Sequence, residues 1–260
     1  MKKQLVLIVS AMIIAPLLWR PFSVRAVGQS VAFEVASVKR VASSPGPVRS
    51  ILLFSPDGGF RTTNASLKSL VQTAYHVQDF QISGASGWMD SDKYDVQAKP
   101  AIDIKPSRGD TLLMLQNLLV DRFKLKIRRE TREDPVYALM VAKDGPKMHI
   151  ATDPSGGARG GANGRLTGKR TMAQLAEMLS GILRRPVVDQ TSMAGVYDFT
   201  LEWLPEVGQT GPDALSPAPA DPNAPSIFTA LQEQLGLRLE SSKAQVEILI
   251  IDHAEPASEN

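Results

Sequence analysis

A helix-start pattern recurs four times in this chain, and it constrains the fold more than any other feature of the sequence. In each copy a Ser or Thr is followed at once by an apolar residue, and further apolar residues continue at helical spacing. Ser and Thr hydroxyls accept hydrogen bonds from the free N–H groups of a first helical turn, so each copy predicts an N-cap. The four predicted caps are Ser66, Thr111, Thr171 and Ser226.

Two runs with strand character follow each predicted helix. The first runs are residues 80–82, 123–127, 186–188 and 237–239, and the second runs are residues 94–98, 136–141, 196–203 and 246–251. Short runs rich in β-branched and aromatic residues are typical of strands. The chain is therefore predicted to be an α+β protein with four helix–strand–strand units on one or two mixed sheets. The first and third units, and likewise the second and fourth units, begin at similar distances from each other along the chain. This spacing predicts an internal duplication.

The segments between the units set the predicted domain boundaries. The predicted order is a first half over residues 27–143, a turn and Gly-rich loop over 144–168, a second half over 169–254 and a tail over 255–260. Residues 154–168 are rich in Gly and residues 205–225 are rich in Pro, so both are expected to be mobile or extended. We expect one compact body, because units this small need a shared sheet.

The chain after residue 26 is predicted to begin with a strand over residues 33–39, where polar and apolar residues alternate. Phe33, Val35 and Ser37 are expected to share the buried face of a half-buried sheet. A second short strand is expected over residues 51–54, before a turn that is rich in Gly.

The first 26 residues have the pattern of a secretory signal. Lys2 and Lys3 precede an uncharged run of about 15 residues, shorter than the roughly 20 that span a bilayer. The small-residue site ending at Ala26 predicts cleavage and export to the periplasm or the outside. Arg20 and Arg25 leave open an uncleaved N-terminal anchor, and no other membrane span is expected.

Charge and cysteine content exclude several function classes. The net charge of +2 becomes −2 without residues 1–26, because that segment carries four basic residues and no acidic one. A mildly acidic protein has no general attraction for nucleic acid, so no nucleic-acid partner is predicted. The chain has no Cys, which excludes disulfides, a thiol nucleophile and a lipid-modified N-terminal Cys.

Local motifs of common enzymes are missing from the sequence, so no catalytic residue, metal or cofactor is predicted. The run from Asp90 to Asp95 resembles a calcium loop, but Asp95 and Ala101 replace the Gly and Glu that such a loop requires. We predict a non-enzymatic binding or interaction protein. The alternative is a secreted hydrolase whose site assembles from distant residues, namely His76, Asp79, Asp90, Asp92 and His149.

One segment offers a candidate binding face. Its six basic residues are Arg122, Lys124, Lys126, Arg128, Arg129 and Arg132. The first four alternate with apolar residues, so a strand here would have one basic and one apolar face. This face predicts docking of an anionic envelope polymer or an envelope protein. A solvated strand face that discourages edge pairing is the alternative.

The whole ordered set of motifs resembles a known family. It comprises FEVASVKR, NASLKSLVQTAYHVQDFQISG, WMDSDKYDVQAK, LLVDRFKLKIRRETREDPVYALMVAK, TMAQLAEMLSGILRRPVVDQTSMAGVYDFTLEW and PSIFTALQEQLGLRLESSKAQVEILIIDHAEPASEN. The set is similar to an uncharacterised family of exported proteins expanded in soil acidobacteria. That family has no established activity, so the resemblance implies no catalytic residues. Some of its relatives appear joined to membrane sensor-peptidase domains, which implies ligand sensing.

The helix–strand–strand unit has a second, weaker resemblance. It is similar to the short N-terminal modules of secretins and TonB-dependent receptors, which bind protein partners in the periplasm. This resemblance implies protein interaction rather than catalysis.

Overall fold

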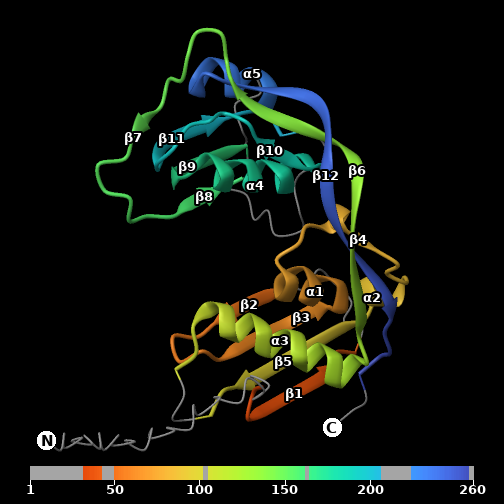
Figure 1. Ribbon diagram of the computed structural model, residues 1–260. Coiled ribbons are helices and arrows are strands. Elements are labelled where there is room, and N and C mark those ends of the chain that lie inside the picture. The colour runs from red at the N-terminus through yellow and green to blue at the C-terminus, as the bar shows by residue number, and fades with distance from the viewer. Residues whose placement is uncertain (1–31, 43–49, 102–104, 162–163, 206–223, 258–260) are drawn as a thin grey trace, which may run out of the picture. The chain divides into compact units, whose positions relative to one another are not determined.

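The computed structural model describes residues 32–42, 50–101, 105–161, 164–205 and 224–257 (Figure 1). The predicted signal and residues 206–223 of the Pro-rich segment lie outside the described residues. Helices and three four-stranded sheets make up the described chain, which confirms the α+β class.

The first sheet is antiparallel and has the order β1-β5-β3-β2. Its strands are β1 (Val35–Arg40), β2 (Ile51–Phe54), β3 (Phe60–Ser66) and β5 (Lys93–Lys99). Two helices, α1 (Leu67–Tyr75) and α3 (Arg108–Phe123), pack on one face, and the short α2 (Trp88–Ser91) lies between β4 and β5 in the chain. Tyr94 and Phe123, both fully buried, meet edge to face with ring centroids 4.9 Å apart in this core.

The second sheet is also antiparallel and has the order β7-β11-β9-β8. Its strands are β7 (His149–Ile150), β8 (Ala158–Gly160), β9 (Arg165–Arg170) and β11 (Tyr197–Glu202). Its core contains Trp203 and residues of α4 (Met172–Leu183), α5 (Ile227–Ala230) and η2 (Leu231–Leu235). The two sheets have the same strand order. In the second sheet, the places of β1, β5, β3 and β2 are taken by β7, β11, β9 and β8.

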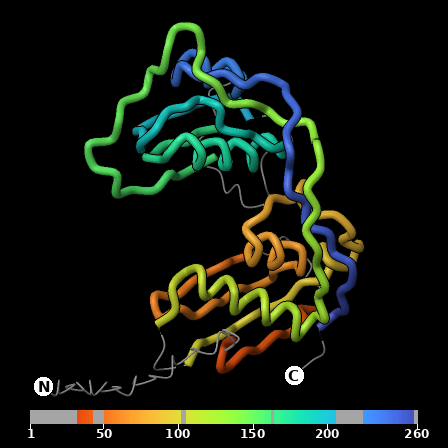
Figure 2. Tube along the Cα trace, viewed as in Figure 1, coloured from red at the N-terminus to blue at the C-terminus, as the bar shows by residue number. Residues whose placement is uncertain are grey.

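The third sheet joins strands from both halves in the order β10-β6-β12-β4. Its strands are β4 (Ile82–Ser83), β6 (Lys126–Val141), β10 (Val187–Asp189) and β12 (Leu237–His253), and η1 (Asp79–Gln81) precedes β4. The long strands β6 and β12 are antiparallel and run side by side (Figure 2). Each short strand pairs in parallel with the other half's long strand, β4 with β12 and β10 with β6. This exchange ties the halves by backbone hydrogen bonds.

Three of the four predicted caps are confirmed, and the fourth is wrong. The hydroxyls of Ser66, Thr171 and Ser226 accept from backbone N–H groups three residues on. However, α3 begins one turn before Thr111, because Ser107 and Asp110 cap its start reciprocally. A capping box satisfies two free N–H groups at once, whereas the Thr111 hydroxyl donates to carbonyls.

The fourfold recurrence of a helix–strand–strand unit is not confirmed, because two of the four helices are followed by one long strand. Residues 237–239 and 246–251 belong to the single strand β12, and residues 136–141 end the single strand β6. Residues 128–135 and 240–245, which lie between those runs, continue the two paired strands instead of forming turns. Of the strand predicted over residues 80–82, only Ile82 lies in a strand, because residues 79–81 form a 3₁₀ turn and β4 begins at Ile82.

The Gly-rich segment also differs from the prediction of a loop. β8 and the first four residues of β9 lie within it and pair with each other. A Cβ at Gly168, where φ is +146°, would collide with the backbone of Gly157 and Ala158. Glycine at position 168 therefore allows β8 and β9 to approach each other closely.

The inward face of the first strand is the reverse of the predicted one. Val35 is 62% exposed, whereas Val38 is 2% exposed and pairs with the buried Val96. Side chains of a strand alternate between its two faces, so a shift of the register by one residue moves every buried side chain to the solvent face. Phe33 still packs against the first core, because it precedes the strand.

Candidate functional site

The predicted basic face is not one continuous strand. Arg122 lies in the last turn of α3, Lys124 ends that helix in the left-handed conformation, and β6 begins only at Lys126. The strand prediction over residues 122–125 is therefore wrong. The helix continues because Phe123, which is 0% exposed, extends the apolar stripe of Leu119 into the core.

Most charges of this segment have acidic partners. Arg128 pairs with Glu130 at 2.8 Å and with Asp252 at 3.1 Å, and these hydrogen bonds raise the pKa of its guanidinium above the usual value. Further ion pairs join Arg129 to Glu247, Arg132 to Asp134 and Arg122 to Asp121. Consecutive residues Arg128 and Arg129 point to opposite faces of β6. The anionic-ligand role of the six residues stays a prediction.

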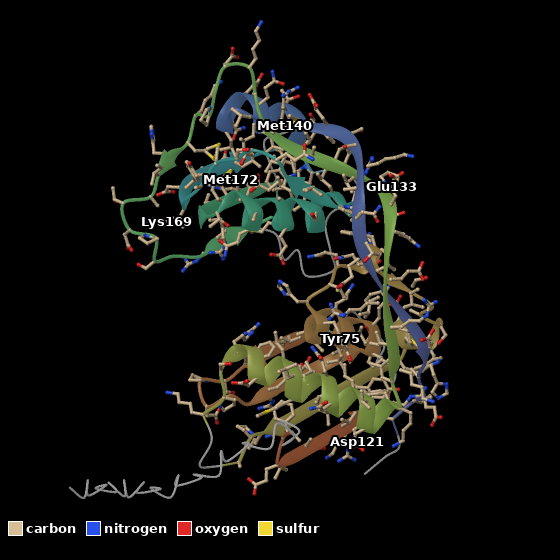
Figure 3. All side chains as sticks on the ribbon, in the orientation of Figure 1. Tyr75, Asp121, Glu133, Met140, Lys169 and Met172 are labelled. Carbon is tan, nitrogen blue, oxygen red and sulfur yellow. The ribbon has the colours of Figure 1, made fainter. Side chains whose placement is uncertain are left out.

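Paired charges continue along the two long strands. Glu133 of β6, labelled in Figure 3, lies 3.3 Å from Lys243 of β12, and their strands are hydrogen-bonded neighbours. Exposed pairs of this kind contribute about 0.2 to 1 kcal/mol each and set pairing register more than stability.

The structure brings together only some of the alternative hydrolase residues. Asp79 and Asp90 both contact the Lys68 ammonium, at 2.5 and 3.4 Å, and the hydrogen bond that Lys68 donates to Asp79 raises the pKa of Lys68. Asp92 instead pairs with Arg40, and His149 is exposed on β7. His76 is the member of the set that lines a cavity.

That cavity measures about 460 Å³. Its walls come from α4, from β10 with the residue before it, and from residues 76–81 between α1 and β4. The apolar part of the lining comprises Phe80, Ala173, Ala176, Pro186, Val187 and Val188, and the polar part comprises His76, Gln78, Gln81, Glu177, Ser180 and Asp189. We name this space the α4 cavity.

The sequence of α4 explains why the space is not filled. Ala173, Ala176 and Ser180 recur at helical spacing and line the cavity with small side chains, whereas Leu175 and Leu179 enter the core. Ser and Ala leave room where Leu or Met would not. The sequence reasoning missed this site, although a small-residue stripe on a predicted amphipathic helix is a visible signal.

Two polar side chains of the lining hold the fold together. The Ser180 hydroxyl donates to the Ala176 carbonyl and accepts from the Val187 N–H, both at 2.8 Å. The Gln81 carboxamide accepts from the Gln78 N–H at 3.0 Å and donates to the Glu247 carbonyl at 3.1 Å. Ser180 is therefore a positioning residue for β10, and its proton already has an acceptor.

A contact between a histidine and a glutamate lies at the edge of the α4 cavity. His76 ends α1 in the left-handed conformation, and its Nε2 lies 2.7 Å from Glu177 Oε1 on α4. A histidine beside a carboxylate resembles the base–orienter pair of some hydrolases. Such a pair needs a nucleophile or metal-bound water within reach of the imidazole.

The described residues do not supply that third component in the α4 cavity. The Ser180 hydroxyl is the one aliphatic hydroxyl in the lining, and its bonds are those given above. Among the described residues, no group of three or more His, Asp or Glu side chains could hold a metal ion. The geometry is that of a partly apolar cavity.

Within the described chain, no helix combines the length and apolar content that a bilayer crossing needs. Comparison with curated proteins and with solved structures gives no significant match. A family described as a protein of unknown function (DUF3738) matches residues 68–254. The expansion in soil acidobacteria and the likeness to secretin modules stay predictions. Because the match covers most of the sequence, the chain belongs to the DUF3738 family.

Proposed function

We propose that this protein is an exported, non-enzymatic binding protein whose ligand occupies the α4 cavity. The observation that carries the proposal is a cavity of about 460 Å³ whose lining is half apolar and half polar. Ligand sites are concave, mostly apolar and marked by a few convergent polar groups, and their volumes begin at about 300 Å³. The signal pattern of residues 1–26 supports export.

A thermal-shift screen of the protein without residues 1–26 tests the binding proposal. Binding to the native state raises the free energy of unfolding, by about 2.7 kcal/mol at a ligand concentration 100 times Kd. Small aromatic and aliphatic fragments are expected to raise the melting temperature of the wild type and not that of Ala173→Trp, because Trp fills the cavity from an exposed position on α4.

The matched control is Leu113→Trp, which places the same side chain on α3 at a site that is 49% exposed and outside the cavity lining. That variant should keep the wild-type response. Equal responses of all three proteins would place the ligand elsewhere, and no response from the wild type would refute the proposal.

A secreted hydrolase is the second candidate, and the contact between His76 and Glu177 is the observation that favours it. In that case the imidazole would act as a base toward a water molecule. His76→Gln should then abolish hydrolysis of a substrate panel and leave fragment binding unchanged. If the wild type hydrolyses nothing, or if His76→Gln hydrolyses as fast, this candidate fails.

A further inference from the structure

We propose that the α4 cavity selects a ligand with a protonated amino group on an apolar body. The inference rests on the proposed function and adds the chemical class of the ligand. Three observations carry it: the sign of the charge on the lining, the unused oxygens of two carboxylates and the aromatic ring of Phe80.

The ionisable side chains that line the cavity are His76, Glu177 and Asp189. With histidine counted as neutral at pH 7, the lining carries two negative charges and no Lys or Arg. The two arginines next in the chain are engaged outside the lining. Arg184 lies 3.8 Å from Asp79, and the Arg185 guanidinium stacks 4.2 Å from the Tyr137 ring centroid.

Each carboxylate has one oxygen left for a ligand. Glu177 Oε1 contacts His76, and Asp189 Oδ1 accepts from the Thr191 N–H at 2.9 Å and hydroxyl at 2.7 Å. Across the described chain, no other side chain or backbone group bonds to Glu177 Oε2 or to Asp189 Oδ2. An ionised carboxylate accepts at both oxygens, so a donor with positive charge completes each group.

The apolar walls add to this preference. Phe80, Val187 and Val188 form an apolar part of the lining, and opposite charges attract each other more strongly beside an apolar surface than in bulk water. The face of an aromatic ring such as Phe80 also attracts a cation within about 6 Å of its centroid. In a protonated amine with an apolar substituent, the ammonium group would contact the carboxylates of the lining and the apolar substituent would contact the apolar walls.

Three probes of similar shape and different charge test the inference: 2-phenylethylamine, 2-phenylethanol and 3-phenylpropanoate. Titration calorimetry at pH 8 and low salt, on the protein without residues 1–26, gives their dissociation constants. We expect the amine to bind at least about tenfold tighter than the alcohol, since a hydrogen bond to a charged group contributes about 1.5 to 3 kcal/mol. The propanoate should bind most weakly.

Glu177→Gln removes one charge from the cavity and keeps the shape of the side chain. The amine should lose about tenfold in affinity in this variant, whereas the alcohol should bind as before. Glu233→Gln on η2 is the matched control, because it makes the same change of net charge at an exposed site outside the lining. The control should bind the amine as the wild type does.

A peptide with one lysine, tested beside the free amine, distinguishes a small-molecule ligand from a protein side chain. Equal affinity for amine, alcohol and propanoate would overturn the inference while the binding function stands. An amine preference that survives Glu177→Gln would also overturn it. If no probe binds, the inference and the proposed function both fail.

Discussion

Replacing Ser180 by Ala tests whether this hydroxyl holds β10 in place. Its Oγ accepts from the Val187 N–H, and both residues are buried, with 6% and 8% of their surface exposed. A buried N–H left without a partner costs about 1 to 3 kcal/mol. Ala is the better helix former by about 0.5 kcal/mol, which offsets part of this loss. The expected net destabilisation is about 1.5 kcal/mol.

Urea unfolding followed by tryptophan fluorescence measures this change, because Trp203 is buried in the same core as α4. With a slope of about 3 kcal/mol/M, the midpoint should fall by about 0.5 M. Ser69→Ala on α1 is the control: its hydroxyl also donates to a backbone carbonyl but accepts from no buried N–H, so the midpoint should hardly move. A Ser180→Ala midpoint equal to that of the wild type would refute the reasoning.

Three further perturbations test the cap of α3, the partly buried Lys68 and the loop after α3. Ser107→Ala should lower the free energy of unfolding by about 1 kcal/mol in a urea titration, because it removes the N-cap of α3, and an unchanged midpoint would mean that the helix does not need it. The hydrogen bond to Asp79 raises the pKa of Lys68 above 10.5, so the stability that this pair contributes is present below the unfolded-state pKa and is lost as pH rises through the folded-state pKa. Melting temperatures between pH 10 and 12 should therefore fall less in Lys68→Met than in the wild type, and parallel curves would contradict this. Leu125→Asp should unfold the protein, since Leu125 is 2% exposed and an unpaired buried charge costs several kcal/mol, whereas Lys124→Glu should change stability by under about 1 kcal/mol; circular dichroism that shows the reverse would place the wrong side chain inside.

Local chemistry made several elements predictable. Ser66, Thr171 and Ser226 cap helices as predicted, because a hydroxyl before an apolar helical stripe satisfies N–H groups within the same turn. The strand over residues 51–54 was also predicted with its observed bounds. For the helix caps, the hydroxyl and the N–H that it accepts from are three residues apart. For the strand, residues typical of a turn follow it directly in the sequence.

The candidate site was not predictable in the same way. The α4 cavity needs residues 76–81 and residues 186–189 beside α4, and those segments are more than 100 positions apart in the chain. The pairing of His76 with Glu177 likewise depends on a tertiary contact that no spacing rule predicts. The basic residues between 122 and 132 were visible, but their acidic partners Asp252 and Glu247 lie on β12.

The amino-acid sequence alone determined the α+β class, most helix starts and the absence of thiol chemistry, because these depend on composition and on contacts within one turn or one strand. Tertiary structure decided which face of β1 is buried and that β6 and β12 are single long strands. It also decided that β4 and β10 each pair with the other half's long strand. Strand pairing depends on residues far apart in the sequence, and many registers are compatible with the local pattern of apolar and polar residues. The observed register both buries the apolar faces and satisfies the backbone hydrogen bonds.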